Sequence, residues 1–316
     1  MHRSHITFRT GQCFAARQGG AAVLVAMLVV AIAALAASSF MFRSRVEWRR
    51  LENLSNLDQA HWVLRAAQLW GAAVLLDDTR QSSVDHLGEL WATRLPPVEA
   101  EGYRVSGVIE DMDGRFNLNN LVLNGQIDEQ QLAILVRLLG ALHLPEDLAV
   151  AVADWMDADD VPLNPGSVDS AYYQSLPTPS RAANRPLVNI NELLAVRGFD
   201  RNVLSVLRPY VAALPTSTSI NVNTASPEVL TALVEGLSSQ EAYTMVAKRE
   251  RTYYRNAADF QQALPGGIMA PAGISVSSQY FLVQARARKE RLAIGNQAMF
   301  RRAGAGMPTL VWRADL

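Results

Sequence analysis

The chain has almost no cysteine, because its single one, Cys13, lies close to the N-terminus. The rest of the sequence therefore forms no internal disulfide, and packing or a metal ion must stabilise it. Common enzyme motifs are also missing: the sequence has no GxSxG, HExxH or GxxxxGK[ST], and its five histidines are scattered, at His2, His5, His61, His86 and His143. These absences predict a protein that is not an enzyme.

An excess of positive charge is absent too. The chain has 29 basic and 30 acidic residues, and three of the basic ones, Arg3, Arg9 and Arg17, precede Gly20. Beyond Gly20 the count is 26 basic against 30 acidic residues, a net charge near −4. This balance argues against nucleic acid as the main partner.

A long apolar run is present once, from Ala21 to Phe42. Its length of about 22 uncharged residues suits a helix that spans a bilayer core of roughly 30 Å. The basic residues ahead of it hold the N-terminus in the cytoplasm. Small residues at Ala33–Ala37 leave ordinary signal-peptide cleavage as an alternative. We expect a retained single-pass anchor.

The helical pattern continues beyond the apolar run. Apolar residues recur at spacings of three and four between Leu51 and Val74, no proline precedes Pro96, and Gly71 is the only glycine between Ala21 and Asp77. One helix of about 55 residues, on the order of 80 Å long, is predicted. The alternative is a break near Arg43–Arg50 that separates a membrane helix from a core helix.

The remaining sequence mixes strand and helix patterns. A strand is expected from Tyr103, before the DMDG turn at Asp111–Gly114, and two strands flank Lys289–Glu290 with a third at TLVWR. Between them, apolar stripes predict four helices, at Gln131–Leu142, Glu146–Met156, Ile190–Val196 and Val203–Val211. We therefore expect an α+β protein in which a long N-terminal helix packs on an antiparallel sheet.

Two segments share one plan. Val188–Val211 and Ile220–Arg249 each show an Asn-x-Asn helix start, an apolar helix, a glycine turn and a second helix. This resembles the helix-hairpin-helix plan of the competence DNA receptor. DNA-binding hairpins use Gly-apolar-Gly turns, so that bare amides reach a phosphate. Here the turns read Gly198-Phe199-Asp200 and Gly236-Leu237-Ser238, which favours a structural or protein-binding use.

An acidic run follows the second predicted helix. DWMDADDVPLNPGSVD places five aspartates within sixteen residues, around prolines and a glycine. Hard oxygen ligands on an irregular loop suit Ca²⁺, although the EF-hand spacing is absent. A solvated acidic loop with a helix cap is the alternative. The expected ligands are Asp157, Asp159, Asp160 and Asp169.

The N-terminal layout resembles type IV pilins and type II secretion pseudopilins: a basic leader ending in glycine, then an uncharged helix with an amphipathic continuation. The resemblance implies that a prepilin peptidase cuts RQGG|AAVLV after Gly20 and that the new N-terminus, Ala21, is methylated. Cleavage after Gly19 is the alternative. The fifth residue of the mature chain is usually glutamate in this family, but here it is Val25. This is either a trivial substitution or a mark of the subunit at the filament tip, because a glutamate in the tip subunit would have no subunit above it to pair with.

The sequence is similar to K-type minor pseudopilins over nearly its whole length. The motifs GRFNLNNL, ADWMDADD, NINELLAVRGF and INVNTASPEVLTAL occur in that family's order. The resemblance implies calcium binding by the helical domain and a non-catalytic subunit that caps the periplasmic pseudopilus and helps initiate its assembly. The implied partners are the I-, J- and H-type minor pseudopilins, the major pseudopilin, the inner-membrane assembly platform and the prepilin peptidase.

The expected organisation has six parts. They are a leader (1–20), a transmembrane segment (21–42), a pilin-like region (43–116), an inserted all-α, SAM-like or helix-hairpin-helix-like domain (117–214), a second hairpin region (215–270) and C-terminal strands (271–316). The expected location is the bacterial inner membrane, with the bulk in the periplasm. The alternative function is a membrane-tethered DNA-binding receptor.

Overall fold

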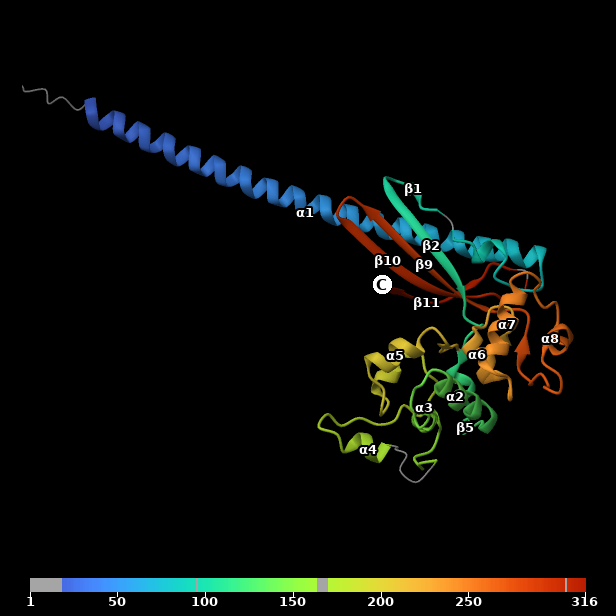
Figure 1. Cartoon of the computed structure of the whole chain (residues 1–316). Coiled ribbons are helices and arrows are strands. Elements are labelled where there is room, and N and C mark those ends of the chain that lie inside the picture. The colour runs from blue at the N-terminus through green and yellow to red at the C-terminus, as the bar shows by residue number, and fades with distance from the viewer. Residues whose placement is uncertain (1–18, 95, 164–169, 305) are drawn as a thin grey trace, which may run out of the picture. The chain divides into compact units, whose positions relative to one another are not determined.

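The computed structural model describes residues 19–94, 96–163, 170–304 and 306–316. Helix α1 runs without interruption from Gly19 to Gln81, over 63 residues (Figure 1). This confirms the single continuous helix, and the alternative of a break near Arg43–Arg50 is wrong. The helix extends past the predicted stripe because Leu75–Gln81 contains neither glycine nor proline.

The start of α1 is long and apolar enough to cross a membrane, with a mean hydropathy of 2.7 in its most apolar window. The chain divides into two compact units, Met1–Gln59 and Ala60–Leu316. In the first unit the side chains of Ala21–Phe42 are exposed. An exposed, uncharged helical surface of this kind fits a lipid environment.

The second unit contains a five-stranded antiparallel sheet in the order β1-β2-β9-β10-β11 (Figure 1). Its strands confirm the predicted ones and the turn at Lys289–Glu290, where Glu290 has a φ of 51°. The first strand of the sheet comes from a segment for which no strand was predicted. The strands are β1 (Val98–Ala100), β2 (Tyr103–Asp111), β9 (Tyr280–Lys289), β10 (Leu292–Arg301) and β11 (Thr309–Asp315).

The C-terminal part of α1 packs on one face of this sheet. Ala60 and Leu64 are fully buried in a cluster with Tyr103, and Leu75 is fully buried beside Trp91. Gly71 brings the helix close to the strands, because a Cβ there would lie 2.9 Å from a methyl carbon of Val283. The expected fold, a long helix on an antiparallel sheet, is confirmed.

The helical region lies in the sequence between β2 and β9 and has one large hydrophobic core, with buried residues from Phe116 to Leu264. Both predicted parts, 117–214 and 215–270, contribute to this core. Its helices are η2 (Leu118–Asn120), α2 (Glu129–Ala141), α3 (Leu148–Met156), α4 (Ser170–Gln174), η3 (Ile190–Ala195), α5 (Arg201–Leu207), α6 (Pro227–Leu233), α7 (Ser239–Arg249) and α8 (Ala257–Ala263).

Short strands and a turn complete the second unit. They pair as β3 (Phe116–Asn117) with β6 (Val211–Ala212), β4 (Val122–Leu123) with β5 (Gln126–Ile127), and β7 (Ile220–Asn221) with β8 (Ile274–Ser275). A single 3₁₀ turn, η1 (Leu90–Ala92), follows α1.

The two hairpin segments differ in detail from the predicted plan. Asn189 caps its helix in a capping box, but that helix is 3₁₀ rather than α. In the second copy Ser226 caps α6, and Asn221 lies in β7 instead. Both glycine turns are present, with φ near 85° at Gly198 and 84° at Gly236.

Candidate functional site

Helix α1 has an apolar surface on the face turned away from the sheet, in the part of the helix that belongs to the second unit. Trp62, Leu69 and Trp70 are 67%, 57% and 55% exposed, whereas Leu64 and Leu75 on the other face are fully buried. The spacing of these residues, completed by two exposed alanines, follows one side of a helix. We call this surface, formed by Trp62, Ala66, Leu69, Trp70 and Ala73, the outer stripe.

The outer stripe has the composition of a binding surface. Indole rings supply large contact areas and are enriched at the centres of protein interfaces. The guanidinium carbon of Arg65 lies 4.9 Å from the centre of the Trp62 ring, so the rim of the stripe carries charge. A monomer would gain nothing from two exposed tryptophans on one helix face, and a partner helix would bury them.

The predicted processing site lies at the start of α1. Gly20 and Ala21 belong to its first turn, whereas residues 1–18 of the leader are outside the described residues. Val25, the fifth residue after Gly20, is exposed on the apolar helix. Cleavage and methylation remain predictions.

The acidic loop begins where α3 ends. Asp157 is the C-cap residue of α3 and is buried, whereas Asp159 and Asp160 are exposed. An Asp159 carboxylate oxygen accepts a hydrogen bond from the Val161 N–H at 2.8 Å. Hydrogen bonds from Ser170 and Asn184 hold the pKa of Asp160 below its ordinary value. Asp169 lies outside the described residues.

Among the described residues, Asp157, Asp159 and Asp160 do not bring three carboxylate oxygens within 4.8 Å of one another. Their donor type, carboxylate oxygen on an irregular segment, is the type that Ca²⁺ prefers. Because the fourth expected ligand, Asp169, is outside the described residues, the metal site remains a prediction.

Three other carboxylates do approach within 4.8 Å of one another: Asp78 on α1, and Asp85 and Glu89 in the segment that follows it. Arg302, from the segment after β10, neutralises part of this charge. Its guanidinium donates to Asp78 at 2.8 Å and to both carboxylate oxygens of Asp85, and the Arg302 side chain is only 9% exposed. The group is a buried ion-pair cluster that ties the end of α1 to the sheet.

Two further carboxylates extend this cluster inward. Asp111, at the end of β2, and Asp113 in the following turn are 8% and 2% exposed. Asp111 accepts hydrogen bonds from the Asn221 amide at 3.1 Å and the Ser278 hydroxyl at 2.6 Å, as well as from a threonine hydroxyl. Asp113 accepts from the backbone N–H groups of Gln279 and Tyr280.

These contacts form a joint between the sheet scaffold and the helical region. We use joint for the group formed by Asp78, Asp85, Asp111, Asp113, Asn221, Thr224, Ser278 and Arg302. The Asn221 amide also donates to the Asp85 carbonyl at 3.1 Å and to the Ser278 hydroxyl at 2.8 Å. One asparagine therefore bonds at once to the segment after α1, to β2 and to the segment before β9.

Ionisation at the joint is unfavourable. Burial is the main cause that raises the pKa of Asp111, and burial followed by the charge of Asp111 raises the pKa of Asp113 to about 7. Burial, then the charges of Glu89 and Asp85, raise the pKa of Asp78 to about 6. The sequence had shown Asp111 and Asp113 only as turn residues, because their burial depends on segments more than 100 residues away.

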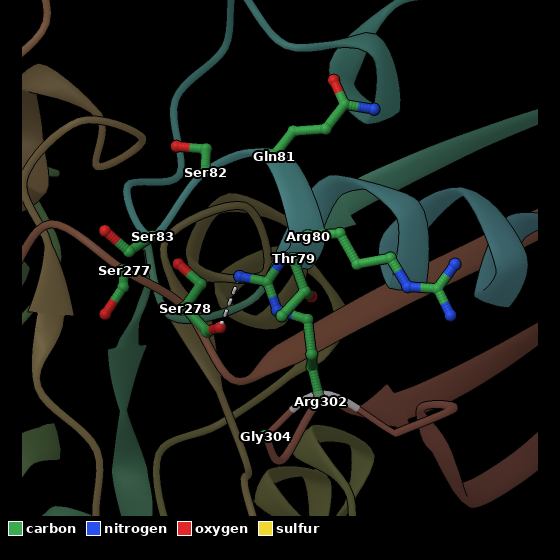
Figure 2. Close-up of a pocket in the computed structure, with 9 residues that line it drawn as sticks. All are labelled: Thr79, Arg80, Gln81, Ser82, Ser83, Ser277, Ser278, Arg302 and Gly304. Carbon is green, nitrogen blue, oxygen red and sulfur yellow. Dashed lines mark hydrogen bonds between the residues drawn. The ribbon is translucent and has the colours of Figure 1, made fainter.

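A shallow pocket of about 400 Å³ lies beside the cluster, lined by serines, Thr79, Arg80, Arg302 and Gly304 (Figure 2). Its polar groups are largely engaged with the protein itself. Figure 2 shows Arg302 directed at Ser278, whose carbonyl it reaches at 3.0 Å, while Arg80 points away. The Ser82 hydroxyl donates to the Val84 carbonyl. This lining does not favour an anionic ligand.

The hairpin turns are not arranged as a phosphate site. The N–H groups of Phe199 and Leu237 donate to the carbonyls of Val196 and Val234. The Asp200 carboxylate caps α5 by accepting from the Val203 N–H at 2.8 Å. Amides already bonded inside the turn, and a carboxylate at the helix N-terminus, do not favour an anion.

Comparisons with known proteins agree with one another. Two family models, both described as type II secretion system (T2SS), protein K, match residues 114–216 and 220–277. The chain is 33% identical over 281 residues to type II secretion system protein K of Pseudomonas aeruginosa, covering 84% of this chain and 83% of the relative. For the protein K of Aeromonas hydrophila the identity is 28%, and the coverage is 84% and 87%.

The fold is similar to a chain in the crystal structure of the GspK-GspI-GspJ complex from enterotoxigenic Escherichia coli. The TM-score is 0.69 at 20% identity, covering 84% of this chain and 99% of the other. These matches confirm the family resemblance and give no support to the DNA-binding alternative. The chain belongs to the type II secretion system protein K family.

Proposed function

We propose that this minor pseudopilin joins other pseudopilins through the outer stripe of α1 and caps the tip of the periplasmic pseudopilus. The observation that carries the proposal is the pair of opposite faces on one helix: Leu64 and Leu75 buried on the sheet, Trp62 and Leu69 exposed on the far side. A helix that has already packed on its own sheet has only this second face for a partner.

The solved complex supports the choice of partners. Its title names an assembly of GspK, GspI and GspJ, and the chain shares its fold with a protein in that complex. The corresponding I- and J-type minor pseudopilins are the expected partners here. The H-type minor pseudopilin, the major pseudopilin, the assembly platform and the prepilin peptidase follow as further partners during assembly.

Co-purification tests this proposal. A charge placed in the stripe, in Trp62→Glu combined with Leu69→Glu, should leave folding intact because both side chains are exposed, and should abolish co-purification with the I- and J-type proteins. Met269→Glu is the matched control, since Met269 is 76% exposed on the helical region. Loss of the complex in Met269→Glu, with binding retained in the stripe variant, would contradict the proposal.

The membrane orientation follows from the charges. The arginines before Gly20 and the absence of acidic residues there support a cytoplasmic N-terminus and a periplasmic bulk. Peptidase cleavage after Gly20 would leave Ala21 as a methylated N-terminus, and Gly20→Ala should slow or block it. Mass spectrometry of the membrane-bound protein reads the terminus directly, and one beyond Ala33 would indicate an ordinary signal peptide instead.

The tip position is supported by Val25. A carboxylate at this depth of the membrane needs a partner, and a subunit with nothing above it has none. Val25→Glu should therefore be neutral or mildly harmful for secretion. Gold labelling of the helical region in assembled pseudopili should mark one end only, and regular labelling along the shaft would contradict the tip position.

The acidic loop supports a structural Ca²⁺ site. Asp157, Asp159, Asp160 and Asp169 would hold the ion, and its charge would relieve the repulsion among carboxylates on a loop with no disulfide. The role is structural, and no catalytic step is assigned to any residue.

A further inference from the structure

We propose that the joint between the sheet scaffold and the helical region is proton-sensitive: a proton held by the buried carboxyl pair Asp111 and Asp113 keeps it closed, and loss of that proton loosens it. This inference is independent of the partner proposal, because it concerns contacts within one chain. It rests on where these two carboxyl groups lie, what they bind and which charges face them.

The first observation is that these carboxyl groups connect separate parts of the fold. Asp111 belongs to β2 and accepts from Asn221 in β7 and from Thr224 just before α6. The Asp113 carbonyl accepts from the Asn221 N–H at 2.9 Å, and its carboxylate accepts from the N–H groups at the start of β9. Weakening either carboxyl group therefore weakens the attachment of the helical region to the sheet.

The second observation is the shortage of positive charge. In the described part of the chain, Arg302 is the cation that contacts this cluster, and its ion pairs are with Asp78 and Asp85. The carboxylates of Asp111 and Asp113 accept hydrogen bonds from neutral donors: backbone N–H groups, the Asn221 amide and two hydroxyl groups. The ionisable or charged groups that face them and their neighbours are Asp78, Asp85, His86, Glu89, Tyr280, Arg301 and Arg302.

Two ionised carboxylates this deeply buried, with one cation already shared between other acids, repel each other and lose hydration. A proton on one of them removes the repulsion and keeps the other as a hydrogen-bond acceptor. Opening of the joint would let water reach both groups, so that they ionise with ordinary pKa values. The closed joint therefore binds more protons than the open joint.

The direction of the pH effect follows from this difference. The pKa of Asp113 is about 7 in the closed joint against 3.8 in an exposed setting. The contribution of Asp113 to the stability of the closed state is therefore largest below about pH 4. It decreases as the pH rises from about 4 to about 7 and is constant at higher pH. Acid therefore strengthens the joint, and the joint is weakest at about pH 7 and above.

Hydrogen exchange on the full chain in detergent micelles tests the proposal. The reporters are the N–H groups of Asn221, Ser278, Gln279 and Tyr280, each of which donates within the joint. After correction for intrinsic exchange, their opening constant should rise about threefold to tenfold per pH unit between about pH 5 and 7, and then level off. The N–H groups of α2, inside the helical core, should not follow this rise.

Asp113→Asn keeps the acceptor oxygen and removes the charge. It should therefore at least halve the slope of the logarithm of the opening constant against pH. Asp77→Asn is the matched control, since Asp77 is an exposed residue of α1 one position from the cluster, and it should leave the slope unchanged. An equal slope in Asp113→Asn, no slope in the wild type, or the same slope in α2 would each overturn the proposal.

A second measurement covers the case in which Asp113→Asn does not fold. The infrared carbonyl band of protonated carboxyl groups should be present in the wild-type protein at about pH 5.5 and lost by about pH 8.5. Its absence at the lower pH would also overturn the proposal.

Discussion

The acidic loop after α3 and the acidic joint at the end of β2 use the same residue type in opposite settings. The loop collects its aspartates within sixteen residues of sequence, and two of the described ones, Asp159 and Asp160, are exposed. The joint buries its aspartates against partners more than 100 residues further along the chain, and Asp85 and Asp113 are 1% and 2% exposed. Local charge density is visible in the sequence, whereas burial of charge is a property of the fold.

The two settings shift pKa values in opposite directions. Hydrogen bonds from Ser170 and Asn184 lower the pKa of Asp160, because they stabilise its ionised form. Burial and a neighbouring charge raise the pKa of Asp113 to about 7, because both oppose its ionised form. Solvent and local hydrogen-bond donors stabilise the ionised carboxylates of a dense acidic run. Such a run in a sequence therefore does not identify the acids whose ionisation lowers the stability of the fold.

The largest effect should come from removing the cation of the joint. Arg302→Met deletes the guanidinium that binds Asp78, Asp85 and the Ser278 carbonyl, and it leaves buried carboxylates without compensation. Loss of one partner of a buried ion pair typically costs about 3–5 kcal/mol. We expect urea unfolding of the full chain in detergent micelles to show a loss of this size at neutral pH.

Arg104→Met is the control for that experiment. Arg104 pairs with Glu99 at 3.5 Å, but both side chains are more than 60% exposed, at 69% and 67%. An exposed pair of this kind contributes about 0–1 kcal/mol. Equal losses in the two variants would show that burial does not distinguish the joint from the surface.

Much of the fold was predictable because its signals are local. The uninterrupted α1, the hairpin around Lys289–Glu290 and the helices α2 and α3 follow from periodicity, proline and glycine placement, and chain reversal. The 3₁₀ form of η3 was not predicted, because its six residues satisfy the same apolar pattern as an α-helix. Tertiary packing, rather than propensity, decides between the two.

The site was predictable only in part. The apolar residues of the outer stripe were visible in the sequence, but their pattern does not show which of the two faces of α1 the sheet covers. The Asn-x-Asn pattern predicts a helix start at Asn221, whereas this residue lies in β7 and bonds to three segments. These contacts join residues that are 57 to 136 positions apart in the sequence, and no helical or strand periodicity predicts contacts over such separations.

A smaller effect is expected from Ca²⁺ at the acidic loop. Binding to the folded state alone raises stability by about 2.7 kcal/mol when the free ion is at a hundred times its Kd. We expect Ca²⁺ to raise the Tm of chelator-treated protein by several degrees. The rise should shrink in the Asp157→Ala, Asp159→Ala double variant.

The control for the calcium experiment is the joint itself. Asp78→Asn changes an acid of the joint and should leave the calcium-dependent rise in Tm intact. If Ca²⁺ has no effect on the wild-type protein, the acidic loop is a solvated loop. If Asp78→Asn alone removes the effect, the ion binds at the joint instead.

The smallest effect should come from Asp78→Asn in the absence of Ca²⁺. Because burial and two neighbouring acids raise the pKa of Asp78 to about 6 from 3.8, this group reduces stability as the pH rises between those values. Asparagine removes that loss and still accepts a hydrogen bond from Arg302, although the charge attraction is lost. We expect the Tm to be unchanged at about pH 4 and to rise by about 1–2 °C at about pH 7.5. Asp159→Asn in the exposed loop should show no such difference between the two pH values. A lower Tm for Asp78→Asn at the higher pH would mean that its attraction to Arg302 outweighs its repulsion by Asp85 and Glu89.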